Sequence, residues 1–327
     1  MQCSKCDREA VTHVAYAGTH LCESHFLRSV EKRVRSRVRE DGLLPDDATP
    51  EDPVTWVLGL SGGKDSVVLG AILQDTFSED PRVDLLALTI HEGIDGYRDE
   101  SVEAAESFAE AYDVPLELVA YDDEFDVRMD DVAADDPLDM APCAYCGVFR
   151  RDVLERYADD LGADLLLTGH NLDDEAQTAL MNVLEGDVAQ IAKHFEASLG
   201  PLDDRAEQDE FVPRAKPLRD VPESEVALYG HLRDLPAQIA ECPHAEEAYR
   251  GEIKSLLHGL EDDHPGTRHS ILSGYEELAR LAADARESNA DESDSAAGDL
   301  GECESCGSPT ASDVCRTCSL LEALDAT

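Results

Sequence analysis

Residues 61–66, with the sequence Ser-Gly-Gly-Lys-Asp-Ser, have the composition of a loop that binds phosphate. They separate the apolar run 54–60 from a second apolar run, 67–73, and this pattern predicts a buried strand, a tight loop and a helix. Glycines let backbone N–H groups approach an anion, a helix N-terminus adds partial positive charge, and Lys64 adds a full one. The stretch therefore predicts a phosphate-binding loop. A glycine turn without a ligand is the alternative.

This loop differs from the Walker A loop in two ways. Gly59 and Gly63 are one residue too close for the Walker A spacing, and Asp65 stands where Ser or Thr should follow the lysine. The string instead resembles the PP-loop of ATP pyrophosphatases, which hold the β and γ phosphates while ATP is attacked at its α phosphorus. The resemblance implies that ATP binds here with Mg²⁺.

A second polar stretch, residues 169–176 with the sequence Gly-His-Asn-Leu-Asp-Asp-Glu-Ala, follows the apolar run 164–168. In the functional interpretation Gly169 allows close packing against the nucleotide, and Asp174 reaches the phosphates or Mg²⁺, which prefers carboxylate and phosphate oxygens. Acidic residues also stabilise helix N-termini without any catalytic role, and that alternative stays open.

Ten cysteines are the other residues able to do chemistry, and eight of them form C-x-x-C pairs. The first residues do not have the pattern of a signal peptide, and no apolar run approaches the ~20 residues of a membrane span. We therefore expect a soluble, cytoplasmic protein without a membrane partner. In a reducing compartment such pairs favour metal ligation over disulfides.

Two sets of these residues, one near each end of the chain, have the spacing of structural zinc sites. The first set joins a C-x-x-C pair to a C-x-x-H pair after fifteen residues, in a segment so poor in large apolar groups that it needs a metal to fold. His20 is a rival for the histidine ligand, and a reactive thiol pair is the alternative to zinc. The predicted zinc ligands are Cys3, Cys6, Cys22 and His25 at one end, and Cys303, Cys306, Cys315 and Cys318 at the other.

The central pair, Cys143 and Cys146, has no second C-x-x-C pair nearby, which disfavours structural zinc. Cys242 is the only cysteine left without a chelating partner, and Pro243 follows it. Three cysteines fit an iron–sulfur cluster with one iron open, and cysteine followed by proline recurs in cluster motifs. A thiol pair that cycles through a persulfide, with Cys242 as a bystander, is the alternative.

Strands that alternate with helices must position these residues. We expect strands at 54–60, 83–90, 115–119 and 164–168, with helices between them, including one from about 148 to 161. This order implies an α/β fold with a doubly wound parallel sheet, whose ligands bind beyond the carboxyl ends of the strands. The glycine loop, His91 and the 169–176 stretch all fall at such ends. Further helices are expected at about 222–232, 245–258 and 270–285.

The formal charge of −46 comes from 73 acidic and 27 basic residues spread along the chain. Such an excess is tolerable in molar salt, where the screening length falls to about 3 Å, and it is typical of proteins of salt-accumulating organisms such as haloarchaea. Residues 28–39 are the exception, because cations and the valines 30, 34 and 38 predict a helix with a cationic face. This helix either binds nucleic acid or faces the acidic surface of the protein itself.

These patterns divide the chain into five parts. Residues 1–30 form a zinc knuckle, 31–53 a basic helix and linker, and 54–287 the catalytic domain. Residues 288–300 are small, polar and acidic, and predict a disordered linker. The final part, 301–327, forms the four-cysteine knuckle.

Taken together, the zinc knuckles, the PP-loop, the central C-x-x-C, the 169–176 string and the late Cys-Pro resemble the TtuA/NcsA family of tRNA 2-thiouridine synthases along nearly the whole chain. The resemblance implies an ATP-dependent sulfurtransferase. The uridine O2 attacks the α phosphorus of ATP, releasing pyrophosphate, and a sulfur nucleophile then displaces AMP. It also implies a [4Fe-4S] cluster on Cys143, Cys146 and Cys242 that binds sulfide, a ubiquitin-like sulfur carrier protein as donor, and a homodimer.

The resemblance also assigns roles to individual residues. Asp174 matches an acidic catalytic position, and Arg150 matches a basic position near the cluster, where arginine can stabilise charge but cannot act as a base. Lys64 and Asp65 belong to the catalytic set with the three cluster cysteines. The residues implied to bind the nucleotide are Leu60, Ser61, Gly62, Gly63, Lys64, Asp65, Ser66, His91, Gly169 and Asp174.

The target uridine and the partners are less closely determined. Wobble position 34 is expected, since the T-loop position 54 is associated with heat and this composition indicates salt. Both the zinc modules and the basic helix are expected to contact tRNA. The alternatives are another PP-loop tRNA enzyme, such as one that thiolates uridine 54 or a cytidine or makes lysidine, and a non-catalytic zinc adaptor that binds nucleotide.

Overall fold

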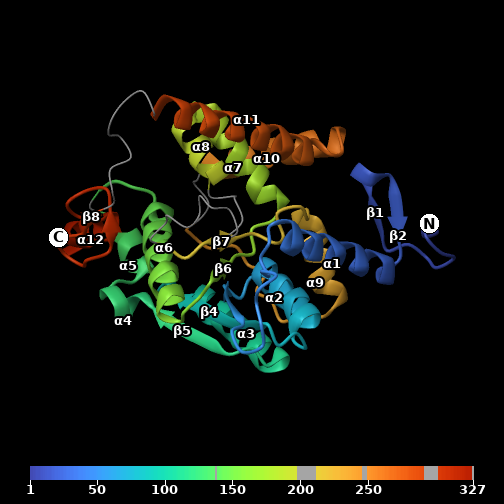
Figure 1. The fold of residues 1–327 in the computed structure, drawn as a ribbon, viewed down its shortest axis with the longest axis horizontal. Coiled ribbons are helices and arrows are strands. Elements are labelled where there is room, and N and C mark those ends of the chain that lie inside the picture. The colour runs from blue at the N-terminus through green and yellow to red at the C-terminus, as the bar shows by residue number, and fades with distance from the viewer. Residues whose placement is uncertain (137, 197–210, 245–248, 291–300, 326–327) are drawn as a thin grey trace.

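The computed structural model describes residues 1–136, 138–196, 211–244, 249–290 and 301–325 (Figure 1). The acidic segment 203–210 and most of the predicted linker 288–300 lie outside the described residues. Within the described ranges, none of the helices combines the length and the apolar character that a membrane crossing requires.

A five-stranded parallel sheet forms the centre of the molecule, in the order β5-β4-β3-β6-β7. Its strands are β3 (Val54–Gly59), β4 (Val83–His91), β5 (Leu116–Ala120), β6 (Leu165–Leu167) and β7 (Arg214–Ala215). The first strand, β3, lies in the middle, and the chain continues first to one side of it and then to the other. The predicted doubly wound α/β fold is confirmed, with the topological switch point between β3 and β6.

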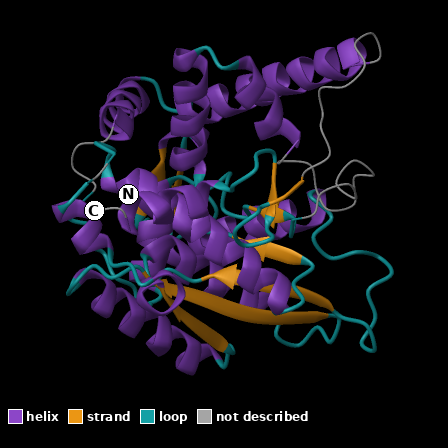
Figure 2. Ribbon diagram, turned by 90° about the vertical axis from the view of Figure 1, so that its left-hand side faces the viewer, coloured by secondary structure: helices purple, strands orange, loops and turns teal. Residues whose placement is uncertain are grey.

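Helices cover both faces of this sheet, as Figure 2 shows. Trp56 and Leu58 pack on one face with α1 (Glu23–Glu40), α2 (Lys64–Phe77), α3 (Tyr97–Tyr112) and α9 (Glu223–Leu232). Val57 packs on the other face with α5 (Met129–Ala134), α6 (Pro142–Asp160) and α12 (Arg316–Asp325). The alternation follows from strand geometry, because successive side chains point to opposite faces.

Helix α6 begins earlier than the sequence analysis placed it, at Pro142 rather than near residue 148. Proline suits the first position of a helix, where its missing N–H has no partner to lose and its fixed φ is already helical. Cys143 and Cys146 therefore lie on the first two turns of a helix, and not in a loop that precedes it.

Helix α1 buries Phe26, Val30, Val34 and Val38 in the core of the catalytic domain. The amphipathic helix predicted from the valines is present, but it starts at Glu23 and so crosses the boundary expected between residues 30 and 31. The following segment also joins the core, since Leu43 is fully buried and its carbonyl accepts a hydrogen bond from Trp56 Nε1 at 3.0 Å.

The remaining elements form a helical group and two small terminal modules (Figure 1). The group comprises α7 (Leu172–Glu185), α8 (Val188–Glu196), α10 (Tyr249–Asp263) and α11 (Thr267–Ala290), which contact one another. The modules are built on the hairpins β1 (Thr12–Val14) with β2 (Thr19–Leu21), and β8 (Gly301–Glu302) with β9 (Pro309–Thr310). Short helices α4 (Tyr121–Phe125) and η1 (Ala15–Ala17) complete the chain.

Candidate nucleotide and cysteine site

The predicted phosphate loop joins β3 to α2 at the switch point of the sheet. Ser66 Oγ lies 3.0 Å from Ser61 Oγ and accepts a hydrogen bond from Ser61 N at 3.1 Å, which closes the loop on the first turn of α2. Gly62 has φ +77°, and a Cβ there would lie 1.8 Å from the carbonyl oxygen of Ser101. Only glycine fits that position, so the loop depends on it.

A cavity of about 330 Å³ opens beside this loop, at the carboxyl ends of β3, β4 and β6. Its volume falls within the range of small-molecule sites. Predicted site residues contribute much of the wall, namely Leu60, Ser61, Asp65, Ser66, Arg150, Gly169 and Asp174. Gly169 is also required for a close approach within the protein, because a Cβ there would lie 2.8 Å from the backbone nitrogen of Ser66.

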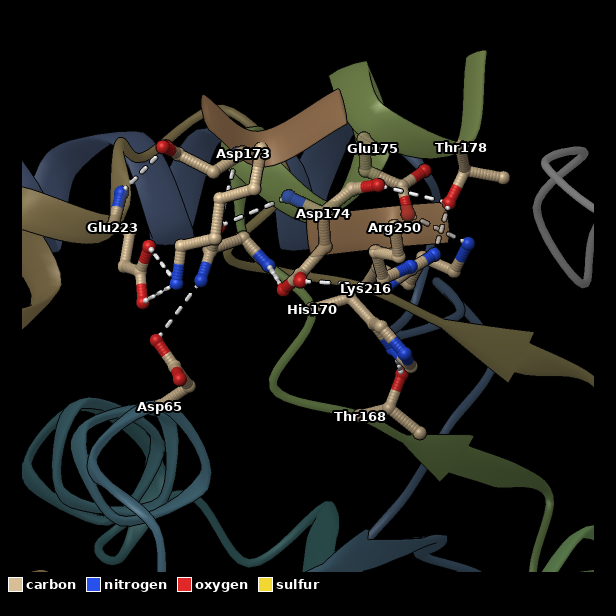
Figure 3. Close-up of polar contacts among 12 residues, drawn as sticks. Asp65, Thr168, His170, Asp173, Asp174, Glu175, Thr178, Lys216, Glu223 and Arg250 are labelled. Atoms are coloured by element: carbon tan, nitrogen blue, oxygen red, sulfur yellow. Dashed lines mark hydrogen bonds and ion pairs between the residues drawn. The ribbon is translucent and has the colours of Figure 1, made fainter. Parts of the chain in front are cut away.

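Asn171 connects the two polar stretches. As N-cap of α7 its side chain accepts hydrogen bonds from the backbone of Asp173 and Asp174, and its Nδ2 donates to Asp65 Oδ1 at 3.0 Å. Asp174 returns the capping interaction by accepting from Asn171 N at 3.1 Å. The capping alternative is thus realised, but capping engages only Asp174 Oδ2, while Oδ1 lies 3.8 Å from Arg250 in the cavity wall (Figure 3).

Asp174 and His170, both in the cavity wall, have shifted pKa values. Burial, together with the charges of Asp65 and Glu223, raises the pKa of Asp174 to about 6 against a hydrogen bond from Asn171 that lowers it. Burial and the nearby Lys216 lower the pKa of His170 to about 4, so its imidazole is neutral at pH 7. His170 also lies 2.9 Å from Thr168 Oγ1 (Figure 3). The sequence analysis did not select His170, because one histidine beside a strand gives no specific signal.

Two predicted residues point elsewhere. The His91 ring lies 3.2 Å from Asp99, and its neighbours Ile90 and Glu92 line the cavity instead. Lys64 Nζ lies 2.9 Å from Glu223 Oε1 and 3.0 Å from Asp65 Oδ2, and Lys64 lines a second cavity of about 590 Å³. Gly62 and Gly63 are not in the wall of the first cavity. The carbonyl oxygen of Gly62 accepts a hydrogen bond from Gln238 N at 2.8 Å.

A chain of charges, buried at Arg98 and Glu92 and half-exposed at Arg150, links the loop to the central cysteines. Arg98 donates to the carbonyl of Ser61 at 2.9 Å and forms an ion pair with Glu92, and both of their side chains are almost fully buried. Glu92 Oε1 accepts hydrogen bonds from Arg150 Nε at 3.0 Å and from its terminal nitrogen at 2.7 Å. The same terminal nitrogen donates to Cys146 Sγ at 3.2 Å. Arg150 thus lines the cavity and contacts a cysteine at once.

The three central cysteines come together from distant parts of the chain. Cys146 is buried on α6, Cys143 is exposed one turn earlier, and Cys242 packs at the edge of the same apolar cluster. Cys143 Sγ donates to the carbonyl of His244 at 3.5 Å, which fixes the Cys242 segment against α6. Burial raises the pKa of Cys242, and the charge of Cys143 raises it further.

This arrangement fits a cluster better than a single metal ion. Each cluster cysteine binds a different iron, so the three sulfurs need not converge as zinc ligands do. Within the described residues the trio does not form one of the tight groups whose ligand atoms all lie within 4.8 Å of one another. The Arg150 guanidinium supplies a charge-assisted hydrogen bond of the kind that stabilises a thiolate ligand.

In each of the two terminal sets, by contrast, the four ligand atoms all lie within 4.8 Å of one another. His25 Nδ1 lies 3.3 Å from Cys22 Sγ, 3.4 Å from Cys3 Sγ and 3.5 Å from Cys6 Sγ. His20 instead stacks on His13 with ring centroids 4.3 Å apart. At the other end Cys306 and Cys315 lie 3.7 Å apart. Both sets have the four ligands and the geometry that a closed tetrahedral site requires.

A third convergent group, Asp173, Glu223 and His258, is an ion-pair network. Asp173 lies 3.2 Å from Arg268 Nε, and Glu223 lies within 3.3 Å of both Lys64 and Lys254. Asp173 and Glu223 therefore already have cationic partners, Arg268 for the first and Lys64 and Lys254 for the second.

Most cations near the expected nucleic-acid surface are paired. In α1, Arg33 pairs with Glu225, and Arg37 with Asp41 and Asp220. The cations of 211–219 are also bound, Arg214 by Glu155, Lys216 by Glu175 and Arg219 by Glu276. By contrast, Lys5, Arg28 and Lys32 line a groove of about 400 Å³ beside the first cysteine set.

Comparison with known proteins agrees with this geometry. The PP-loop domain model matches residues 31–235, and the model of the N-terminal LIM domain of 2-thiouridine synthetase TtuA matches residues 2–27. The chain is 66% identical to the tRNA 2-thiolation protein NcsA of Haloferax volcanii, over 100% of both chains. The chain belongs to the NcsA family of PP-loop tRNA 2-thiolation proteins. The predicted resemblance is thereby confirmed.

Other NcsA-family relatives are more distant but equally complete. The structure of the U34-tRNA thiolase NcsA of Methanococcus maripaludis with its [4Fe-4S] cluster is 33% identical, covers 99% of this chain and 96% of that one, and superposes with a TM-score of 0.79. Cytoplasmic tRNA 2-thiolation protein 1 of Aspergillus niger is 36% identical over 99% of this chain and 88% of its own.

Proposed function

We propose that this protein is an ATP-dependent tRNA-uridine 2-sulfurtransferase that acts on uridine 34. The observation that supports it most strongly is the position of Arg150, which lines the cavity beside the phosphate loop and also donates a hydrogen bond to Cys146. An activated base in the cavity would thus be adjacent to the cysteine site. The U34 thiolase from Methanococcus maripaludis, similar along nearly its whole length, supports the choice of uridine.

In the first step the uridine O2 attacks the α phosphorus of ATP and pyrophosphate leaves. The N–H groups of the glycine loop and the N-terminus of α2 would hold the β and γ phosphates, as helix N-termini hold anions generally. Asp65 and Asp174, both in the cavity wall, are the carboxylates available to Mg²⁺. Arg150 and Arg250 line the same wall and are placed to stabilise negative charge that develops on the phosphoryl group.

In the second step a sulfur nucleophile displaces AMP from C2. Cys143, Cys146 and Cys242 would hold a [4Fe-4S] cluster, which when bound supplies an open iron coordination site for sulfide. Arg150 keeps the Cys146 thiolate hydrogen-bonded, and Glu92 keeps Arg150 in place through two hydrogen bonds to one carboxylate oxygen. Because Arg150 is also part of the cavity wall, it holds Cys146 in a fixed position relative to the cavity in which the uridine is activated.

The terminal sets are proposed to bind one zinc ion each, which would give two per chain. The groove of Lys5, Arg28 and Lys32 next to the first set suits the tRNA backbone, because cations on a groove wall are available to phosphates. A ubiquitin-like sulfur carrier protein, a homodimer and a cytoplasmic location complete the proposal. The cytoplasmic name of the Aspergillus niger relative supports the last of these.

The decisive experiment measures AMP release from ATP in the presence of tRNA. We expect Lys64→Ala to lower release by about 10²-fold or more, the usual effect of removing one electrostatic stabiliser. A tRNA carrying cytidine at position 34 is the matched control and should release no AMP with the unchanged protein. Persistent AMP release by Lys64→Ala would place the reaction at another site. AMP release with the control tRNA would indicate that uridine 54 or a cytidine is the target. ATP binding without AMP release would indicate a non-catalytic adaptor.

A further inference from the structure

Lys64 is bound to carboxylates and does not point into the nucleotide cavity. Its Nζ lies between Glu223 Oε1 at 2.9 Å and Asp65 Oδ2 at 3.0 Å. Asp65 belongs to the phosphate loop itself, whereas Glu223 is contributed by α9 from a distant part of the sequence. The one lysine of the phosphate loop is therefore held by a residue that the loop motif does not predict.

The backbone of Glu223 is fixed where it stands. Glu223 N donates to Asp173 Oδ2 at 2.8 Å (Figure 3). Asp173 in turn is nearly fully buried and paired with Arg268. A carboxylate on a backbone anchored in this way cannot follow Lys64 if the lysine turns toward the cavity. Release of Lys64 therefore requires that the ion pair with Glu223 breaks.

A second lysine is in place to stay with Glu223. Lys254 Nζ, on α10, lies 3.3 Å from Glu223 Oε2 and 3.5 Å from Glu223 Oε1. If Lys64 leaves, Glu223 keeps one cation and is not stranded as a half-buried unpaired charge, which would be costly. Lys254 thus lowers the free-energy cost of separating Lys64 from Glu223.

We propose that Glu223 is a positioning residue for the phosphate loop, which holds Lys64 away from the phosphate cradle until nucleotide phosphates displace it, while Lys254 retains Glu223. The inference rests on the proposed use of ATP by this loop. An ammonium group cannot make its closest contacts with Glu223 and with the phosphates at the same time, so the two anions compete for it. Phosphates win because a triphosphate brings more negative charge and also binds the loop N–H groups.

The test is the dissociation constant of ATP, and separately of pyrophosphate, measured by titration calorimetry without tRNA. Glu223→Gln keeps the shape of the side chain but removes the competing charge. We expect affinity for both ligands to rise about 3- to 10-fold, the scale of losing one partly exposed ion pair. A role in structure alone predicts weaker binding together with a lower melting temperature, and no role predicts no change; either result would overturn the proposal.

Glu241→Gln is the matched control for general charge effects. Glu241 is exposed and lies 3.8 Å from Lys254, so this change removes one carboxylate from the same neighbourhood without touching Lys64. Its effect on ATP affinity should be less than half of that of Glu223→Gln. An equal effect would mean that charge alone, and not competition for Lys64, sets the affinity.

Two further variants keep the idea testable if Glu223→Gln does not fold. Lys254→Met leaves Glu223 with Lys64 as its closest remaining cation, so ATP should bind more weakly, and unchanged or tighter binding would contradict the exchange. In a Lys64→Met background the effect of Glu223→Gln should disappear, since the lysine that transmits it is gone. These are binding measurements, so failure of AMP release would count against the proposed reaction, and failure of these affinity changes only against the role of Glu223.

Discussion

The terminal cysteine sets and the central cysteine trio are built on opposite plans. Each terminal set brings four ligands together from one short stretch, and its atoms all lie within 4.8 Å of one another. The central trio combines one turn of α6 with a loop beyond α9. One of its members, Cys146, accepts a hydrogen bond from Arg150, which lines the nucleotide cavity. Closed coordination at the ends suits a structural metal, whereas open coordination beside the cavity suits a reactive one.

The strongest way to break this comparison is to remove a ligand from the first terminal set. Cys22 is buried and is the N-cap residue of α1, and the neighbouring Leu21 and Phe26 pack into the main core. We expect Cys22→Ser to lose one zinc per chain and to lower the free energy of unfolding by about 4 kcal/mol, because a structural metal contributes directly to folding. Metal analysis and urea denaturation measure the two effects.

The exposed Cys306 of the second set provides the matched variant. Cys306→Ser should also lose one zinc, but it should destabilise the catalytic domain less, because that module contacts the domain mainly through α12 on α6. Retention of both metal ions in Cys22→Ser would show that the first set is not a zinc site.

Removal of Cys242 should change the visible absorbance of the protein and leave its zinc content and its stability nearly unchanged. We expect Cys242→Ala to lose the broad visible absorbance of anaerobically purified protein while it keeps both zinc ions. The free energy of unfolding should change by about 1 kcal/mol or less, since Cys242 is only partly buried in a loop. Absorbance spectroscopy with metal analysis makes the measurement. Unchanged absorbance would refute three-cysteine ligation and favour the persulfide alternative on Cys143 and Cys146.

These contrasts also show what the sequence could predict. The loop at 61–66, the individual strands and the terminal ligand sets depend on residues close together in the chain, whose spacing carries the information. His25 could be preferred over His20 from its C-x-x-H spacing alone, and the structure agrees by stacking His20 on His13. The two partners of Lys64 illustrate the limit, because Asp65 is adjacent in sequence while Glu223 follows a proline in an ordinary helix start.

Buried polar contacts account for the rest of what was missed. The Glu92–Arg98 pair holds the carbonyl of Ser61, yet an arginine at the start of a helix looks in the sequence like any surface residue. Gly169 lines the cavity, and it also allows the segment after β6 to pass close to the backbone of Ser66, a contact that the sequence does not reveal. The first turns of α6 were missed because the helix was expected to begin near residue 148, although Pro142 is a favourable first residue of a helix.

The smallest expected effect concerns the pH dependence of Asp174, which shares the cavity with Arg150. Its pKa is raised to about 6 from 3.8, chiefly by burial, so the folded protein binds this proton more tightly than the unfolded chain does. Its stabilising contribution is therefore complete below pH 3.8 and is lost as the pH rises through about 6. Asp174→Asn should remove this dependence and raise the free energy of unfolding at pH 7.5 by about 1 kcal/mol, since the side chain is 30% exposed and water screens part of the cost.

The same titration should control nucleotide binding with the opposite sign, because only the carboxylate form can bind Mg²⁺. Affinity for ATP with Mg²⁺ should increase as the pH rises through about 6 in the unchanged protein and stay flat in Asp174→Asn. Glu185→Gln, an exposed carboxylate at the other end of α7, is the control and should keep the pH dependence. Zinc content should not vary over the same interval. If it did, the terminal sets and the cavity would not be independent, and the division between closed structural sites and an open reactive one would fail.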